Sequence, residues 1–281
     1  MPTKLELPAI DDTALMDAYI GERNQPNRTY FENYKDVWSA RYEEYTINLG
    51  NPLNITFSDI QDADKTKFIN LYKSPTGTIE SDIIDEIEDH NLSYCPFCSG
   101  LGVPDTLDHF LPKDKYPEYS IFSKNLIPAC DSCNRAKSTK TVDATGEKMF
   151  FHPYYDDINV YEIYKLDILP PYDIAPNFTL SINPAIPEDI RVIAENQIKE
   201  LKVKKRFRKH FKGEYKRLKK EVFKNKANAN IPLVALINIF YSKAQGVSIN
   251  FWDTVIYRAV LANNDLMEYL DTLEEENNEN N

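Results

Sequence analysis

Apolar side chains recur at helical spacing through the first ninety residues of the chain. They fall every three or four positions in TALMDAYIGERN (13–24) and in YFENYKDVWSARYEEYTINL (30–49), which places them on one face of a helix. A third stretch, SDIIDEIEDHN (81–91), opens on Ser81, a residue type that caps helices, and carries acidic side chains in its first turn. Residues 1–90 are therefore predicted to be a mostly helical region.

The hydrophobic pattern changes between residues 91 and 155. Short apolar runs, glycines and prolines replace the long periodic stretches, and all four cysteines and two of the four histidines lie here. Residues 156–190 form a Pro-rich connector in which VYEIYKLDI (160–168) and NFTLSIN (177–183) alternate between apolar and polar side chains. Alternation of this kind predicts a few short strands.

Helical spacing returns from Pro187 and runs to about Asn225, with Gly213 as a candidate break. Two more helices are predicted near 232–244 and 251–273, and the most apolar run of the chain, IPLVALINIFY (231–241), is expected to be buried. The acidic tail, residues 274–281, is predicted to be disordered. The whole pattern predicts an α+β fold that is predominantly helical, in which a small core at 91–155 is flanked by helical regions at 1–90 and 191–273.

Composition agrees with a globular protein. The 281 residues are 42% hydrophobic, enough for a packed core, and no apolar run reaches the roughly 18 residues of a membrane span. The start, MPTKLELPAIDDT, lacks the basic and apolar stretches of a secretory leader. These features predict a cytoplasmic protein that has no membrane partner.

Charge is spread unevenly along the chain. The net charge of −11 at first disfavours a nucleic-acid partner, but residues 199–226 hold fourteen Lys and Arg against three Glu, a local charge of +11. The apolar residues of this segment recur as on one helix face: Val203, Phe207, Phe211, Leu218 and Val222.

Cations fill the rest of that predicted helix, and a polyanion is their natural partner, because neutralised phosphates release counterions. The alternatives are a solvated amphipathic helix and a helix that docks on this protein's own acidic surface. The predicted nucleic-acid contacts in this segment are Lys204, Lys205, Arg206, Arg208 and Lys209.

The four cysteines form two Cys-x-x-Cys pairs, Cys95 with Cys98 and Cys130 with Cys133. Structural disulfides are rare in a reducing compartment, and this spacing fits tetrahedral zinc coordination by four thiolates. Two unrelated buried pairs are one alternative. A redox pair is weaker still, because no βαβ pattern surrounds either motif. A site with four cysteine ligands is closed, so the zinc is expected to be structural.

Between the two pairs, LDHFLPKDK places Asp108 beside His109. A carboxylate is a good ligand for Mg²⁺-type ions, and an imidazole can take a proton from water near neutral pH. An isolated Asp-His pair in a surface turn would look the same. Because the two cysteine pairs of a candidate zinc site lie on either side of Asp108 and His109, a functional role is favoured.

In this order and spacing, CPFCSG, LDHFLPK, NLIPAC and CDSCNRAK resemble the HNH endonucleases of the ββα-metal type. The resemblance covers residues 95–137 and extends at most to FFHPYYD (150–156). It implies a zinc-braced β-hairpin followed by a helix. It says little about the flanking regions.

The resemblance also implies roles for single residues. His109 matches the general base, and Asp108 matches a carboxylate ligand of the catalytic Mg²⁺ or Mn²⁺. Asn125 matches the middle asparagine that fixes the loop and orients the base. Asn134 matches the third position, here Asn in place of His, and would be the second protein ligand of the catalytic metal.

Four further residues are candidates for contact with phosphate. Arg135 and Lys137 follow Asn134 closely and Lys113 follows the Asp-His pair, although each could be an ordinary solvated cation. His152 lies in an HPY segment that related nucleases share, which hints at the edge of the site. A histidine that is hydrogen-bonded where its strand packs on the zinc finger is the alternative.

The implied function is metal-dependent cleavage of DNA, with RNA not excluded, by a nuclease of bacterial anti-phage defence. Nucleases of this kind sometimes act beside a regulatory ATPase partner. The alternatives are a non-catalytic, zinc-structured module that binds nucleic acid and an adaptor subunit of a larger complex.

Overall fold

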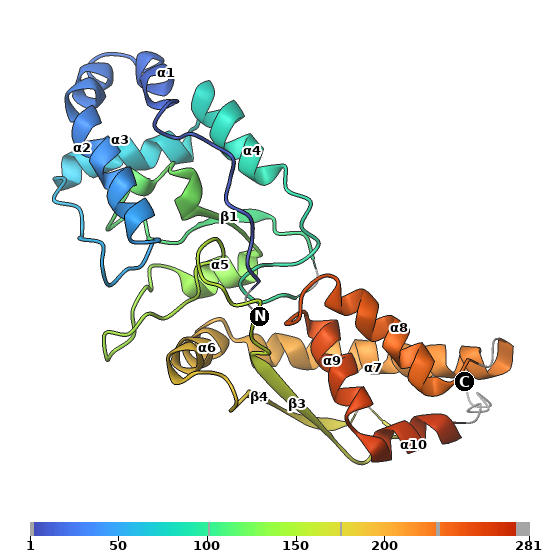
Figure 1. Ribbon diagram of the computed structural model, residues 1–281. Helices are drawn as coiled ribbons and strands as arrows, with labels where there is room; N and C mark the ends of the chain where they lie inside the picture. The colour runs from blue at the N-terminus through green and yellow to red at the C-terminus, as the bar shows by residue number, and fades with distance from the viewer. Residues whose placement is uncertain (1–2, 101, 175, 229–230, 274–281) are drawn as a thin grey trace. The chain divides into compact units, whose positions relative to one another are not determined.

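The computed structural model describes residues 3–100, 102–174, 176–228 and 231–273 and divides the chain into two compact units. The N-terminal unit is Pro2–Asp157, and the C-terminal unit begins at Ile158. Each contains helices and one two-stranded antiparallel sheet (Figure 1), which confirms the predicted α+β class. The regions predicted at 1–90 and 91–155 thus fold together, as do those at 156–190 and 191–273, and the predicted tail at 274–281 lies outside the described residues.

The N-terminal unit begins with helices held together by aromatic side chains. They are α1 (Met16–Gly21), α2 (Asn27–Ile47) and α3 (Asp62–Lys73), followed by the π-helical turn Glu80–Ile84 that continues into α4 (Asp85–Glu88). The ring of Phe68 on α3 lies 5.2 Å from that of Phe31 and 4.8 Å from that of Trp38, both on α2. Edge-to-face packing of this kind fixes α3 against α2.

A β-hairpin and a short helix follow. Strand β1 (Thr106–His109) pairs with β2 (Leu126–Ala129), so that Asp108 lies opposite Ile127 and His109 opposite Leu126. The loop between them contains the 3-10 turns Pro117–Tyr119 and Ser123–Asn125, and α5 (Asp131–Lys137) starts two residues after β2. Helix α2 supports the loop, because Trp38 Nε1 donates a hydrogen bond to the carbonyl of Glu118 at 2.8 Å.

The C-terminal unit pairs β3 (Tyr164–Leu169) with β4 (Asn177–Ile182), in the two runs where alternation predicts strands. Its helices are α6 (Glu188–Glu200), α7 (Val203–Asn228), α8 (Leu233–Gln245), α9 (Trp252–Leu261) and α10 (Asn264–Thr272). The apolar face predicted for α7 is confirmed, since all five of its predicted residues are buried.

Two details of the C-terminal unit differ from the prediction. The break in the long helical pattern falls at Lys202, whose φ is +52°, and Gly213 lies inside α7. The run 231–241 is only half buried, because Leu236 and Ile237 face inward while Val234 and Ile239 are more than half exposed. Among the described residues no helix is both long and apolar enough to cross a membrane.

A buried carboxyl connects the N-terminal segment to the loop of the hairpin. Asp12 accepts hydrogen bonds from the backbone N–H and the hydroxyl of Ser123, at 2.8 and 2.6 Å. Burial raises the pKa of Asp12 to about 6, although both bonds from Ser123 act to lower it. The loop that ends at Asn125 is therefore held by a group that titrates within the physiological range.

The stability of the fold should depend on the ionisation of Asp12. Because its folded-state pKa of about 6 exceeds the ordinary 3.8, the folded chain binds this proton more tightly than the unfolded chain. The free energy of unfolding should fall by up to roughly 3 kcal/mol as the pH rises through 4 to 6. Asp12→Asn removes this titration, so denaturation curves of the variant and the wild type should diverge with pH. A constant difference between them would contradict the prediction.

Candidate functional site

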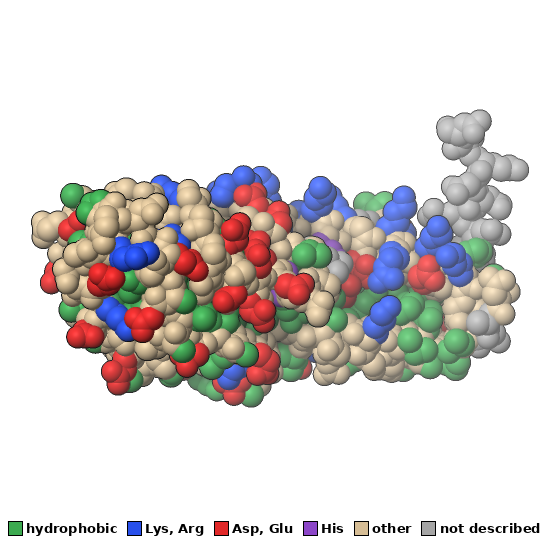
Figure 2. Space-filling view, turned by 90° about the horizontal axis from the view of Figure 1, so that it is seen from above, with side chains coloured by type: hydrophobic (Ala, Val, Ile, Leu, Met, Phe, Trp, Pro, Cys, Tyr) green, Lys and Arg blue, Asp and Glu red, His purple; other side chains and the backbone are tan. Residues whose placement is uncertain are grey.

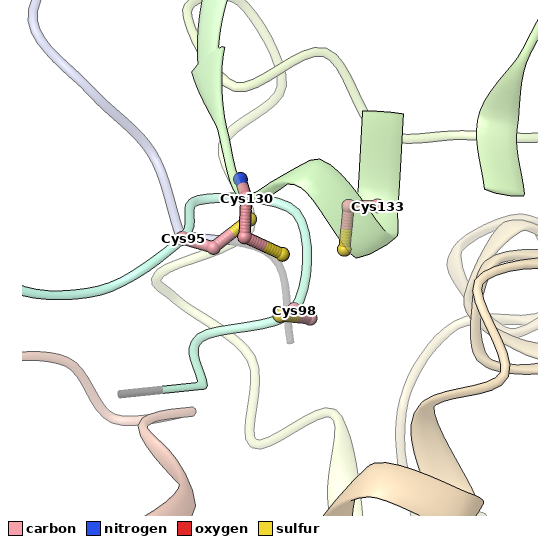
Figure 3. A group of neighbouring side chains, drawn as sticks. All are labelled: Cys95, Cys98, Cys130 and Cys133. Atoms are coloured by element: carbon pink, nitrogen blue, oxygen red, sulfur yellow. The ribbon is translucent and has the colours of Figure 1, made fainter. Parts of the chain in front are cut away.

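The four cysteines converge on one point, as Figure 3 shows. Cys95 and Cys98 lie in the turn before β1, and Cys130 and Cys133 lie at the start of α5. Their sulfur atoms are all within 4.8 Å of one another. Four thiolates about 2.3 Å from one zinc ion would be about 3.8 Å apart, so the cluster fits a tetrahedral zinc site.

The chemistry of the thiols also fits a metal ion. The backbone N–H of Cys130 points to Cys95 Sγ at 3.4 Å, a contact that stabilises negative charge on sulfur. Hydrogen bonding to the thiol of Cys133, and then to that of Cys95, lowers the pKa of Cys130 to about 7. The pKa of Cys98 is lowered as well, whereas burial raises that of Cys95 and hydrogen bonding to Cys130 raises that of Cys133. Because metal binding requires deprotonated thiols, a bound ion would displace the protons that Cys95 and Cys133 retain.

His109 ends β1 with a fixed orientation. Its Nε2 lies 2.8 Å from the carbonyl oxygen of Ser120, so Nε2 carries the proton and Nδ1 carries the lone pair. No hydrogen bond to Nδ1 forms within the described residues. Burial lowers the pKa of His109 to about 3, with the positive charge of Lys113 as the next cause. The ring is therefore neutral, and its basic nitrogen is directed away from the carbonyl that holds it.

Asn125 ties the two ends of the hairpin loop together. Its amide nitrogen donates to the carbonyls of Leu111 and Tyr119 at 3.0 and 3.1 Å, and its Oδ1 accepts from the N–H of Leu111 at 2.7 Å. The side chain is fully buried. These bonds fix the backbone on both sides of Ser120, whose carbonyl holds His109, which is the geometry that the resemblance implies for the middle asparagine.

His152 belongs to the support of this loop. It is fully buried and accepts at Nδ1 from the N–H of Tyr154 at 3.2 Å. Its Nε2 therefore carries the proton and donates to the Tyr45 hydroxyl at 2.9 Å, which in turn donates to Asn125 Oδ1 at 3.0 Å. Burial holds the pKa of His152 well below its usual range. The structure thus favours the hydrogen-bonded alternative for His152 over contact with phosphate.

Helix α5 lies along β1 and places two side chains against it. Asn134 donates from Nδ2 to the hydroxyl of Thr106 at 3.0 Å, and no bond to its Oδ1 forms in the part of the chain that is described. One turn later, Lys137 Nζ lies 2.8 Å from Asp108 Oδ2 and donates to the carbonyl of His109 at 2.7 Å. Lys137 is 1% exposed and Asp108 is 3% exposed.

This buried ion pair changes the role expected for Lys137. A solvent-facing phosphate contact does not fit an ammonium that is buried between β1 and α5. Burial raises the pKa of Asp108, and the charges of Lys137 and Lys113 oppose that rise. Oδ2 has no aligned hydrogen-bond partner among the described residues, although it forms the ion pair. The carboxylate expected to bind metal is thus already engaged by the Lys137 ammonium, whose charge and hydrogen bond both lower the pKa of Asp108.

Tyr72 and Lys113 complete the surroundings of His109. The ring of Tyr72, on α3, packs edge-on against that of His109 at 4.4 Å, and Lys113 Nζ lies over the Tyr72 ring at 5.3 Å. Arg135, by contrast, is exposed and pairs with Asp131 on its own helix. Neither Tyr45 nor Tyr72 is marked by any motif, so only the folded chain identifies them as neighbours of the site.

The predicted nucleic-acid contacts of α7 belong to the C-terminal unit. Arg206 is half-buried and donates to the carbonyl of Leu201 at 2.9 Å. The other four are exposed: Lys204, Lys205, Arg208 and Lys209. Figure 2 shows Lys and Arg side chains gathered over the C-terminal unit on the face in view. The sequence therefore produces a basic surface despite the negative net charge.

Comparison with known proteins shows one partial similarity. A stretch of 127 residues is 28% identical to protein ea31 of Escherichia phage lambda, over 43% of this chain and 42% of the phage protein. The chain thus spans less than half the length of this relative. No family model matches the chain, and no solved structure matches it.

The cysteine cluster should hold one zinc ion per chain. Elemental analysis of purified protein is expected to give about one zinc, and Cys133→Ser should lose most of it together with the cooperative unfolding transition. Ser132→Ala, on the exposed side of the same helix, should keep both. A wild-type protein that is folded and contains no metal would contradict the predicted zinc site.

Loss of the Lys137 ammonium should destabilise the N-terminal unit. Lys137→Met leaves Asp108 buried without its countercharge, which should cost about 3 kcal/mol, measurable by chemical denaturation. The double variant Asp108→Asn/Lys137→Met should recover most of that loss. Arg135→Met, which breaks an exposed pair on the same helix, should cost less than about 1 kcal/mol. Equal costs for the two single variants would contradict a special role for the buried pair.

Proposed function

We propose that the N-terminal unit is an HNH endonuclease that hydrolyses phosphodiester bonds of DNA with the help of a divalent metal ion. The observation that carries the proposal is the orientation of His109. A backbone carbonyl holds the Nε2 proton and leaves Nδ1 as a free base, and His109 directly follows Asp108 on β1. A hairpin, a helix and a cysteine cluster supply the frame that such a site requires.

The neutral imidazole of His109 has the protonation state of a general base, and the negative charge of a bound phosphate would raise its pKa from about 3 toward the operating pH. Because Ser120 accepts from Nε2, the Nδ1 lone pair can take a proton from water as that water attacks phosphorus. Asn125 fixes the loop that presents this carbonyl, and Tyr45 and His152 fix Asn125 in turn. The ring of Tyr72 limits rotation of the imidazole from the other side.

The residues beside His109 fit a catalytic Mg²⁺ or Mn²⁺. Asp108 Oδ2 is a buried carboxylate oxygen that pairs with Lys137, and Asn134 Oδ1 is a neutral amide oxygen on α5. Oxygen donors of this kind favour hard divalent ions. When bound there, the ion would supply Lewis-acid stabilisation of the departing 3′-oxygen. Lys113, half-buried close to His109, would then face the phosphate.

The basic surface of α7 is proposed to bind the nucleic acid. Lys204, Lys205, Arg208 and Lys209 are exposed, and phosphates would replace their bound counterions. DNA is the proposed substrate and RNA is the other polymer to test. The setting proposed for the enzyme is the cytoplasm, in bacterial defence and under control of an ATPase partner, which follows from the resemblance alone.

A second function is favoured by the ion pair of Asp108. Lys137 already supplies a positive charge to the carboxylate that would bind the catalytic ion. A zinc-structured module that binds nucleic acid or a protein partner without cleaving it would keep this pair permanently. The two functions predict opposite results in a cleavage assay.

Cleavage of supercoiled plasmid should need Mg²⁺ or Mn²⁺ and should fall at least about 100-fold in His109→Ala, because the general base is lost. His90→Ala removes a histidine of the same unit that lies in no such arrangement, and it should cleave like the wild type. Zinc content and melting temperature show that each variant is folded. Unchanged cleavage by His109→Ala would exclude this base, and a wild type inactive on both DNA and RNA would favour the second function.

A further inference from the structure

The C-terminal unit contains a groove of about 660 Å³ at the junction of α6 and α7. Its floor is apolar and consists of Ile182 at the end of β4, Pro184 in the following turn and Ile198 on α6. Its volume is in the range of small-molecule pockets, which combine an apolar lining with a few polar groups.

Cations surround this apolar floor. Five basic side chains line the groove, together with one acidic side chain, Glu195. Arg191 pairs with Glu188, and Lys199 lies 4.0 Å from Glu200. The remaining three, Lys202, Lys204 and Lys205, are exposed and form no ion pair with any described residue. The groove therefore has unbalanced positive charge next to an apolar lining in which Pro184 is exposed, Ile182 is half-buried and Ile198 is buried.

The backbone concentrates that charge. Lys202 adopts a left-handed conformation between α6 and α7, so lysines from both helices reach the same rim. Lys204 and Lys205 then lie in the first turn of α7, which contains no acidic residue. Cations near the N-terminus of a helix are destabilising, because that end of the helix dipole is itself positive. A bound anion would relieve this repulsion, and Glu195 is the acidic side chain that already lines the groove.

We propose that this groove binds a nucleotide, with its phosphate at Lys202, Lys204 and Lys205 and its base on Ile182, Pro184 and Ile198. Three separate cations fit a phosphate of more than one charge better than a single carboxylate. A short apolar floor fits a flat base better than an acyl chain. The nucleotide is either free or the 5′-phosphorylated end of a strand. The site shares Lys204 and Lys205 with the nucleic-acid surface proposed for α7, but it does not depend on the nuclease chemistry proposed for the N-terminal unit.

Isothermal titration of the full chain tests this with adenosine 5′-monophosphate, adenosine and inorganic phosphate. The nucleotide should bind one per chain and at least about tenfold more tightly than adenosine or phosphate alone. Equally tight binding of inorganic phosphate, or no binding of the nucleotide and of the strand ends described below, would overturn the proposal. The same measurements with a 5′-phosphorylated and a 5′-hydroxyl pentanucleotide distinguish the sources. Tighter binding of the phosphorylated strand identifies a strand end, and tighter binding of the monophosphate identifies a free nucleotide.

A matched pair of triple variants separates a built site from general attraction. Lys202→Gln/Lys204→Gln/Lys205→Gln should weaken nucleotide binding at least about tenfold and should not lower the melting temperature, because cations are removed from the positive end of α7. The control Lys212→Gln/Lys216→Gln/Lys220→Gln removes the same charge from exposed positions of α7 outside the groove. It should change binding less than about twofold. Equal weakening of nucleotide binding by both variants would indicate general attraction to a basic surface and would overturn the proposal.

Discussion

The rest of the N-terminal site depends on how α5 is held against β1. Both strands of the hairpin have four residues and α5 has seven, and elements this short are not stable in isolation. Two constraints fix them. The cysteine cluster joins the turn before β1 to the start of α5, and the Asp108–Lys137 pair joins the end of β1 to the last turn of the same helix. Asn134 lies between these two points, so both its position and its direction are set.

Several of the polar groups around His109 are buried and have a hydrogen-bond partner. Isolated buried donors and acceptors destabilise a fold, whereas a fully satisfied network makes it rigid. The bonds from His152 through Tyr45 to Asn125 form such a network. This network fixes the loop and therefore the Ser120 carbonyl that orients His109. Two buried oxygens near His109 lie outside this network: Ser120 Oγ, and Asp108 Oδ2, which is compensated by the charge of Lys137.

Local patterns predicted part of this arrangement, because their information is contained in a few neighbouring residues. The Cys-x-x-Cys spacing predicted the cluster, alternation predicted β3 and β4, and the spacing of Phe207 and Phe211 predicted the buried face of α7. Long-range contacts left no such signal. Tyr45 reaches Asn125 from 80 residues away, and Tyr72 reaches His109 from α3. The break at Lys202 was missed because a left-handed lysine gives no warning in composition, whereas a glycine does.

Lys137 shows where reasoning from residue types reaches its limit. A lysine near the end of a short helix is usually solvated, and only the packing of α5 on β1 buries it beside Asp108. A divalent ion at Asp108 would lie close to that ammonium, and two cations repel each other strongly at low dielectric. Metal binding would therefore require Lys137 to move, or to share the carboxylate through the oxygen that the ion leaves free. The affinity for the proposed catalytic ion would then be set by how firmly α5 holds this one lysine, and this competition would separate a nuclease from a binding module built on the same frame.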